Sequence, residues 1–335
     1  MKQDTIRKFV SLGLLLILLV VFSLTSEYFL TPANIFTLLR EASIIGIVSI
    51  GVTFCIITAG TDFSTGANVA LVSMICANFL YYTGLPVFIV LLIGVLSGAA
   101  AGCVNGFLVA RLRLPDFIAT LSTQGVFRGL TFVFAIRSAT GVISNKVITN
   151  PDFLLLNGDI GGLYYSTIAF FVLAVIGQLV LKRTKLGTYT YAVGADRKAS
   201  EFSGINIGRV KIAAFLISGI CSAVGGIFLF AKLGSAIPDL GIGLEFDVIA
   251  AVVVGGCAFS GGRGDVFGSV LGSVFLVVLV NGLYKLQMHV SYQLIIKGAI
   301  IILMTIFDSV YMDLMSKYSR GKSPRAGEAV SGGAQ

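Results

Sequence analysis

Repeated apolar runs near 20 residues long are the feature that most constrains this chain. A helix of about 20 apolar residues crosses the hydrocarbon core of a bilayer, which is about 30 Å thick. Hydrophobic residues make up 56% of the 335 and charged residues only 12%, so no soluble core could bury this much apolar surface. The sequence therefore predicts a polytopic membrane protein. The candidate spans are residues 9–26, 42–59, 66–83, 86–109, 117–136, 163–181, 211–232, 246–259, 266–284 and 292–312.

No separate soluble domain is expected. A domain of ordinary polarity needs at least about 50 residues, and the longest polar stretches, residues 137–162 and 182–210, are shorter. We therefore predict an all-α membrane bundle of about ten transmembrane helices over residues 1–315. Residues 316–335 are small, polar and rich in Gly, Ser and Ala, and are predicted to form a disordered cytoplasmic tail.

The distribution of Lys and Arg predicts the orientation of the bundle. The first apolar run has no clear small-residue cleavage site, so we take it as a retained span with a cytoplasmic N-terminus. This orientation places 17 basic residues in the cytoplasm and five outside, as the positive-inside rule expects. Both termini and residues 182–211 are then cytoplasmic. The net charge of +8 reflects this topology, and we expect no binding of nucleic acid.

The sequence offers no catalytic or metal-binding constellation. The five cysteines lie in or beside apolar runs without a CxxC spacing, and His289 is the only histidine. A phosphate-binding GxxxxGK[ST] motif is missing, so the chain is not expected to hydrolyse ATP itself. We therefore predict a subunit that is not an enzyme and uses no cofactor or metal ion.

Glycine-rich segments line or interrupt several apolar runs. Small residues in GVLSGAAAGCVNG (94–106) and SGICSAVGGI (218–227) favour close helix packing, with a permeation path as the alternative. Two breaks, TAGTDFSTGANVAL (58–71) and FSGGRGDVFGSVLG (259–272), combine glycine with charge and resemble one another weakly. They indicate either re-entrant or gating elements, or ordinary cytoplasmic turns.

A polar stripe follows the segment PDFIATLSTQGVFRGLTF (115–132). Its members recur every four residues and so share one helix face. They are Asp116, Thr120, Gln124 and Arg128. A charge near the middle of a span faces the bundle interior or water, so Arg128 either ties helices together or lines a path.

A short charged segment, YAVGADRKASEFSGI (191–205), lies between two long apolar runs. Asp196 is placed to cap the N-terminus of a helix over RKASEFS, and Gly204 stands where a C′ glycine would end it. Three apolar residues at three-residue steps give this helix one apolar edge. They are Ala199, Phe202 and Ile205. The pattern fits either an interfacial helix on lipid headgroups or a helix that docks into a groove of a cytoplasmic partner.

Four separated motifs give the chain a family resemblance. They occur in the order AGTDFSTGA, LPDFIATLSTQGVFRGL, LKRTKLGTYTYAVGADRKASEFSGI and VVVGGCAFSGGRGDVFGSVLG. This succession resembles the membrane permease subunits of bacterial sugar ABC importers, the ribose, xylose and galactoside group, over roughly residues 35–310. The resemblance implies a multi-pass permease in the bacterial inner membrane. It also implies two permease copies around one path, a paired cytoplasmic ATPase and a periplasmic sugar-binding protein.

The resemblance also implies functional residues. The coupling segment that inserts into the ATPase would be Gly194, Ala195, Asp196, Arg197, Lys198, Phe202, Gly204 and Ile205. The break TDFSTGA would lie near the substrate path. Together with the polar stripe it supplies the path candidates Asp62, Ser64, Gly66, Asn68, Gln124 and Arg128. The chain departs from the common family pattern at AGTDFSTG, where GGIDLSVG is usual, and at AVGAD, where AIGGN is usual; Asp196 keeps the capping chemistry of Asn.

The predicted function is that of a permease subunit that moves a monosaccharide or related polyol into the cytoplasm. It would work by alternating access in the lipid bilayer, driven by ATP hydrolysis on a partner chain. The binding protein would dock outside, against loops that include 232–248. That loop concentrates three acidic residues, which either meet a basic partner or are solvated: Asp239, Glu245 and Asp247.

An alternative of another class is an ion-coupled secondary transporter of a small polar solute. In that case Asp62, Asp116 or Arg128 would couple transport to ions or protons. An intramembrane enzyme is a third alternative, and the absence of a plausible catalytic pair counts against it.

Overall fold

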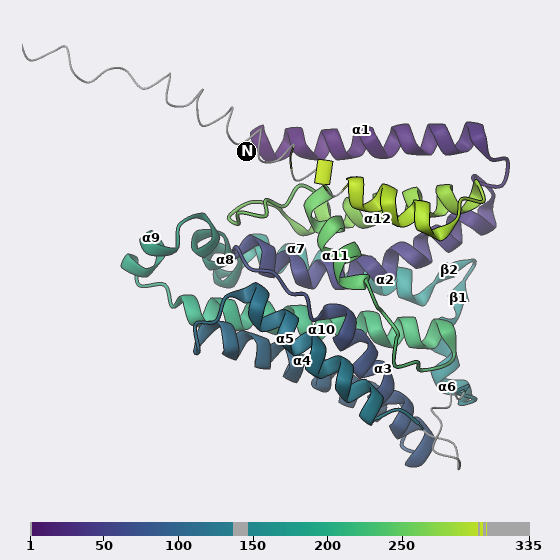
Figure 1. Ribbon diagram of the computed structural model, residues 1–335, viewed down its shortest axis with the longest axis horizontal. Helices are drawn as coiled ribbons and strands as arrows, with labels where there is room; N and C mark the ends of the chain where they lie inside the picture. Colours follow the sequence, from purple (N-terminus) through teal and green to yellow (C-terminus); the bar gives the residue numbers. More distant parts are fainter. Residues whose placement is uncertain (1, 137–146, 301, 304–305, 307–335) are drawn as a thin grey trace, which may run out of the picture.

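The computed structural model is all-α in its described residues apart from one short hairpin, whose two strands have two residues each (Figure 1). It describes residues 2–136, 147–300, 302, 303 and 306, with side chains from residue 11 onward. The predicted tail at 316–335 lies outside these residues. The elements are α1 (Lys2–Thr25), α2 (Pro32–Ile57), α3 (Thr65–Tyr82), α4 (Val87–Ala110), α5 (Asp116–Val133), α6 (Pro151–Leu154), η1 (Leu155–Asn157), β1 (Asp159–Ile160), β2 (Leu163–Tyr164), α7 (Tyr165–Arg183), α8 (Lys185–Ala195), α9 (Arg197–Phe202), α10 (Ile207–Leu233), α11 (Leu244–Val254) and α12 (Val266–Lys285).

Helices lie in all of the predicted apolar runs, so the predicted fold class, a polytopic helix bundle, is confirmed. In the part of the chain that the structure describes, six helices are long and apolar enough to cross a membrane: α2, α3, α4, α7, α10 and α12. Shorter apolar helices cover Ser11–Thr25 and Val290–Ile300. The other two predicted spans differ for physical reasons, because α5 carries the polar stripe and α11 has only 11 residues.

α2 begins well before the predicted apolar run, at Pro32. Proline is favourable in the first helical turn, because its missing N–H would have no intrahelical partner there. The guanidinium of Arg40 lies 4.6 Å from the ring centre of Tyr164, and Glu41 forms an ion pair with Lys232. These charges end an apolar run without ending the helix, since each finds a partner inside the bundle.

α10 is the central helix and packs against α2, α3 and α4 (Figure 1). Glycines permit its close approach to α4. A Cβ at Gly219 would lie 2.3 Å from the carbonyl oxygen of Gly98, and one at Gly102 would lie 2.3 Å from that of Phe215. The glycine segments of these two helices therefore pack backbone against backbone, as the sequence predicts.

The bundle has two distinct ends. Figure 1 shows the start of α1 at the same end as α8 and α9, and the β1–β2 hairpin with α6 at the other. We name these the α8 end and the hairpin end. Both glycine-rich breaks reach the α8 end, because the N–H of Gly262 donates to the carbonyl oxygen of Ile57 at 2.8 Å, directly beside Gly194. The loop between α10 and α11 starts at the opposite end, where Ser235 forms a bridge with Val147.

Candidate functional site

The turn between α2 and α3 places Asp62 inside the bundle, where it is only 2% exposed. Its Oδ1 accepts hydrogen bonds from the backbone N–H of Ser64 at 3.0 Å and from the Ser64 hydroxyl at 2.6 Å. Its Oδ2 accepts a bond from the hydroxyl of Ser218 on α10 at 2.7 Å. A buried carboxylate needs such donors in place of water, so Asp62 fixes the start of α3 against α10.

These hydrogen bonds continue through two further helices. The Ser64 hydroxyl accepts from Nδ2 of Asn105 on α4 at 2.7 Å, and Oδ1 of Asn105 accepts from the Thr123 hydroxyl on α5 at 2.6 Å. We name the connected, buried side chains the polar cluster: Asp62, Ser64, Asn105, Thr123 and Ser218. No sequence motif singles out the last three. The available signal is the lone Asn inside the apolar run of α4, since a buried amide requires a partner on another helix.

Two more path candidates lie in the first turns of α3, and both are buried. Nδ2 of Asn68 lies 3.4 Å from the carbonyl oxygen of Gly219 and 3.5 Å from that of Gly98, at the seam between α4 and α10. A Cβ at Gly66 would lie 2.2 Å from Oε2 of Glu245 and 2.4 Å from the backbone carbonyl oxygen of Gly241. Glycine is therefore required at position 66 for the start of α3 to pack against the loop that precedes α11.

The loop between α10 and α11 does not present the acidic surface that its sequence suggests. Glu245 is 3% exposed, and its Oε1 accepts a hydrogen bond from Nε2 of Gln124 at 2.9 Å. Asp247 forms an ion pair with Lys297 at 2.7 Å, and only Asp239 is exposed. The expectation that all three acids face solvent or a partner is wrong, because α11 begins at Leu244 and turns Glu245 into the bundle.

The polar stripe of α5 faces the bundle along its length. Asp116 forms an ion pair with Lys211 of α10 at 2.5 Å, with both side chains nearly buried. The Thr120 hydroxyl lies 3.3 Å from the carbonyl oxygen of Thr61 in the break after α2. The stripe therefore joins α5 to the turn that carries Asp62 and to α10.

Replacing Arg128 with methionine is expected to loosen the loop at 234–243. Nη1 of Arg128 donates to the carbonyl oxygens of Pro238 and Leu240, both at 2.7 Å. Hydrogen bonds to charged groups contribute about 1.5–3 kcal/mol each, and water can replace part of two such bonds at the half-buried Arg128, so Arg128→Met should lower the free energy of unfolding by about 2–4 kcal/mol. The melting temperature of the purified protein measures this effect. Arg111→Met, at an exposed position, is the control; equal melting temperatures for the two variants would contradict the expectation.

The predicted coupling segment, from Gly194 to Ile205, contains the last two residues of α8 and the whole of α9, at the α8 end (Figure 1). Oδ1 of Asp196 accepts from the N–H of Ala199 at 3.0 Å, and α9 ends at Phe202, before Gly204 at φ +77°. Both predicted caps are therefore present. Phe202 is 92% exposed, so its ring makes almost no contact within the chain. α8, which precedes α9, is a helix that the sequence pattern does not predict.

The end of α8 contacts both glycine-rich breaks. A Cβ at Gly194 would lie 1.7 Å from the carbonyl oxygen of Ile57 and 2.5 Å from the nitrogen of Gly262. The same Ile57 oxygen accepts the Gly262 N–H, and the Tyr191 hydroxyl donates to the carbonyl oxygen of Gly264 at 2.6 Å. We name the backbone contact of Ile57, Gly194 and Gly262 the glycine junction. It joins the predicted coupling segment directly to the turn that leads to Asp62.

Residues that depart from the common family pattern lie beside the polar cluster. Phe63 packs edge to face on Phe117 of α5 and Phe246 of α11, with ring centres 5.3 and 6.0 Å apart. Phe117 is 53% and Phe246 56% exposed. An aromatic group therefore lies on a face of α5 and α11 that the described chain leaves largely uncovered.

These observations define a class of protein. Within the described residues, no group of three His, Cys, Asp or Glu side chains could hold a metal ion. The polar cluster instead forms hydrogen bonds that join membrane helices, and a charged segment projects from one end. A polytopic bundle with a buried polar cluster beside an uncovered face is typical of the membrane subunit of a transporter.

Comparison with known proteins identifies the family. Residues 34–305 match the family described as the permease component of branched-chain amino acid transport systems, and the chain belongs to it. The ribose import permease protein of Bacillus subtilis (strain 168) is 38% identical over 295 residues, 88% of this chain and 90% of that protein. The D-allose transport system permease protein of Escherichia coli (strain K12) is 34% identical over 297 residues, covering 88% and 89%. The galactose/methyl galactoside import permease protein of the same strain is 32% identical over 321 residues, covering 92% and 94%. No solved structure matches the chain.

The chain is therefore the membrane permease subunit of an ABC importer, and the predicted resemblance is confirmed. It is a non-catalytic subunit, because such an importer carries its ATPase on a separate chain and receives its cargo from a binding protein. Family membership favours this function over the ion-coupled transporter.

Proposed function

We propose that this permease moves a monosaccharide or related polyol into the cytoplasm. The observation that carries the proposal is the set of named relatives, which are import permeases for ribose, D-allose and galactose at 32–38% identity over most of the chain. The family description names amino acids, but these individual relatives transport sugars.

Uptake by reconstituted vesicles tests this proposal. The permease would be placed in liposomes with its ATPase and binding protein, and uptake of labelled ribose, D-allose, galactose and leucine would be measured with and without ATP. We expect ATP-dependent uptake of at least one sugar and none of leucine. Uptake of leucine alone would contradict the proposal and support an amino-acid cargo.

The proposed orientation places the α8 end and both termini in the cytoplasm of the bacterial cell, with residues 1–315 as the membrane domain and 316–335 as a tail. The distribution of basic residues supports this orientation, because the predicted cytoplasmic loops lie at the α8 end. The hairpin end would then face the periplasmic binding protein. The loop between α10 and α11 starts at this end and carries the exposed Asp239, which remains available to a basic partner.

We further propose that a second permease copy faces the uncovered side of α5 and α11, with the path between the two copies. The exposed rings of Phe117 and Phe246 support this placement. Gln124 and Arg128, which are half-buried, would lie nearest to the path. The buried candidates would lie farther from the path and hold the helices that line it in position: Asp62, Ser64, Gly66 and Asn68.

α9 and the residues that flank it, from Gly194 to Ile205, are proposed to insert into a groove of the ATPase. The exposure of Phe202 supports this role, because an isolated aromatic ring in water gains its stabilisation only when a partner covers it. Movement of the ATPase would reach the membrane helices through the glycine junction, since the end of α8 contacts Ile57 directly.

Replacing Phe202 with aspartate is expected to release the ATPase without unfolding the bundle. Loss of an aromatic anchor at an interface weakens binding by about 2 kcal/mol or more, which is about 30-fold. Co-purification of the ATPase and vesicle uptake would both be measured. Phe202→Leu should retain most binding, and Leu155→Asp, at an exposed position of the hairpin end, should retain all of it. Wild-type co-purification by Phe202→Asp would show that α9 is not the contact.

A further inference from the structure

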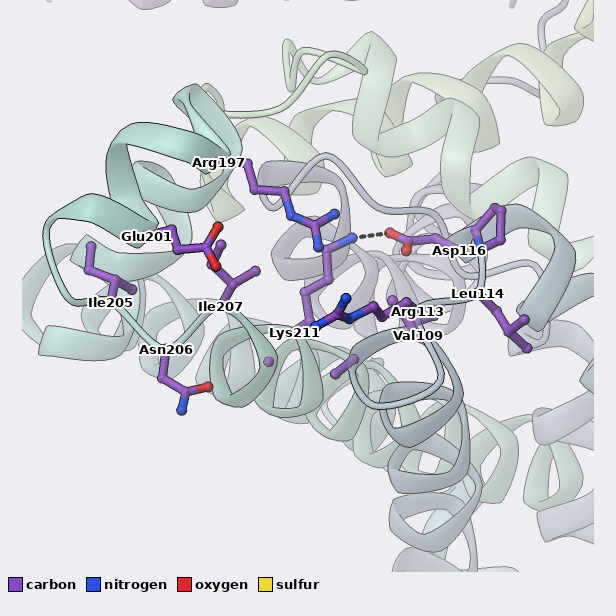
Figure 2. Close-up of a pocket in the computed structure, with 13 residues that line it drawn as sticks. Val109, Arg113, Leu114, Asp116, Arg197, Glu201, Ile205, Asn206, Ile207 and Lys211 are labelled. Atoms are coloured by element: carbon purple, nitrogen blue, oxygen red, sulfur yellow. Dashed lines mark hydrogen bonds and ion pairs between the residues drawn. The ribbon is translucent and has the colours of Figure 1, made fainter.

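A cavity of about 670 Å³ opens at the α8 end, between the turn that joins α4 to α5 and the turn that joins α9 to α10 (Figure 2). This volume is within the range of small-ligand sites. Its charged lining comes from three parts of the chain: Arg113 and Asp116 near the start of α5, Arg197 and Glu201 in α9, and Lys211 in α10. None of these side chains belongs to the polar cluster.

Two guanidinium groups in this cavity have no ion-pair partner among the residues that the structure describes. Figure 2 shows Arg113 and Arg197 extending toward Lys211 from different elements. Lys211 is already bonded to Asp116 at 2.5 Å, whereas neither guanidinium group has a hydrogen bond or ion pair with any residue that the structure describes. Three cations face two carboxylates, counting Glu201, so the wall carries a net charge of +1. The cavity therefore favours an anion.

Two helices also begin at this cavity. The N-terminal residues of α10, Ile207 and Gly208, line it, and so do Pro115 and Asp116 at the start of α5. The first N–H groups of a helix have no intrahelical acceptor, and the helix dipole places about half a positive charge there. Two helix ends and two free guanidinium groups thus converge on one space.

The rim of the cavity is apolar on the side of α5. Leu114, which lines it, is 39% exposed, and the neighbouring Leu112 is 56% exposed. Exposed leucine side chains beside basic groups are typical of the zone where acyl chains meet lipid headgroups.

We propose that this cavity binds a phosphate group, held by Arg113 and Arg197 and by the N-terminal ends of α5 and α10. A guanidinium matches two phosphate oxygens at once, which makes arginine the preferred side chain for this anion. The apolar rim favours a phospholipid headgroup as the source, and free phosphate shares the same chemistry. A bound phosphate would join Arg197 in α9 to Arg113 in the α4–α5 turn and so fix α9 relative to the membrane helices.

Lipid retention by the purified, full-length permease tests this site and requires neither the ATPase nor a sugar. The protein in detergent would be incubated with phosphatidylglycerol, with phosphatidylcholine or with inorganic phosphate, and bound molecules counted by native mass spectrometry. We expect phosphatidylglycerol to bind preferentially. Arg113→Gln and Arg197→Gln should each weaken its binding about tenfold, the effect of losing one charge-assisted pair. Arg209→Gln, at an exposed position outside the cavity, should leave binding unchanged.

Comparison of phosphatidylglycerol with inorganic phosphate shows whether the bound phosphate group belongs to a lipid headgroup or to a free anion. Binding of phosphatidylglycerol that both cavity variants weaken supports a headgroup site, whereas binding of inorganic phosphate with the same dependence supports a free anion. Equal binding of phosphatidylglycerol and phosphatidylcholine, or equal binding by the wild type and both cavity variants, would overturn the proposal. Arg113→Lys keeps the charge and should bind more strongly than Arg113→Gln, which separates loss of the anion contact from misfolding.

Discussion

Gly194→Ala is expected to abolish ATP-driven uptake, although it adds only one methyl group. The new Cβ would lie 1.7 Å from the carbonyl oxygen of Ile57 and 2.5 Å from the nitrogen of Gly262. Both are backbone atoms and cannot rotate away as the end of a flexible side chain can, so the end of α8 must separate from α2. Overpacking of this kind costs about 1–3 kcal/mol, and here the strain falls on the proposed link between ATPase and membrane helices.

Vesicle uptake at matched protein amounts measures this effect, with co-purification of the ATPase as the second readout. Gly129→Ala is the matched control, because a Cβ at this helical position meets nothing within 4 Å. We expect Gly194→Ala to lose uptake while it still holds the ATPase, since Phe202 and the rest of α9 are unchanged. Normal uptake by Gly194→Ala would show that the glycine junction does not transmit the ATPase movement.

The positions of the helices could be predicted from sequence because hydropathy alone specifies them. An apolar run near 20 residues must form a helix in a bilayer, where every backbone group needs an internal partner. The start of α2 could not be predicted in this way. Its first turns carry Arg40 and Glu41, which interrupt the apolar run, and their partners Tyr164 and Lys232 come from distant parts of the chain.

α9 could be predicted almost residue by residue, because its signals are local. Asp196 bonds three residues ahead, and Gly204 provides the left-handed conformation just beyond the end. α8 could not, since Gly187 and Gly194 lower its helix propensity and only tertiary contact explains them. A Cβ at Gly187 would lie 2.0 Å from the carbonyl oxygen of Leu181.

In the candidate site, too, features with a local sequence signal could be predicted, and contacts between distant parts of the chain could not. The stripe on α5 is periodic, and its inward direction follows from one helix face. The partners of that stripe lie on other helices and carry no local signal, as with Glu245 for Gln124 and Lys211 for Asp116. The polar cluster likewise depends on Asn105 meeting Ser64, which lies 41 residues earlier, so a single sequence could nominate its members only by their polarity.

Asp62→Ala is expected to be among the most destabilising substitutions in this bundle. The carboxylate accepts three hydrogen bonds, two from Ser64 and one from Ser218, and it is almost fully buried. Removing one partner of a buried, hydrogen-bonded charge leaves donors without acceptors and costs about 3–5 kcal/mol. We expect a marked fall in melting temperature and in the amount of folded permease, with uptake lost as a consequence.

Asp62→Asn separates a structural role for this side chain from ion coupling. The amide oxygen can replace Oδ1 as the acceptor for both donors of Ser64, and the amide nitrogen can donate to Ser218, whose hydroxyl can turn to accept. Asp62→Asn should therefore keep a melting temperature near that of the wild type and retain most ATP-driven uptake. Ser218→Ala in the same background removes the reversed bond and should cost about 1–3 kcal/mol. Complete loss of uptake by a well-folded Asp62→Asn protein would mean that the negative charge itself acts in transport, as an ion-coupled mechanism requires.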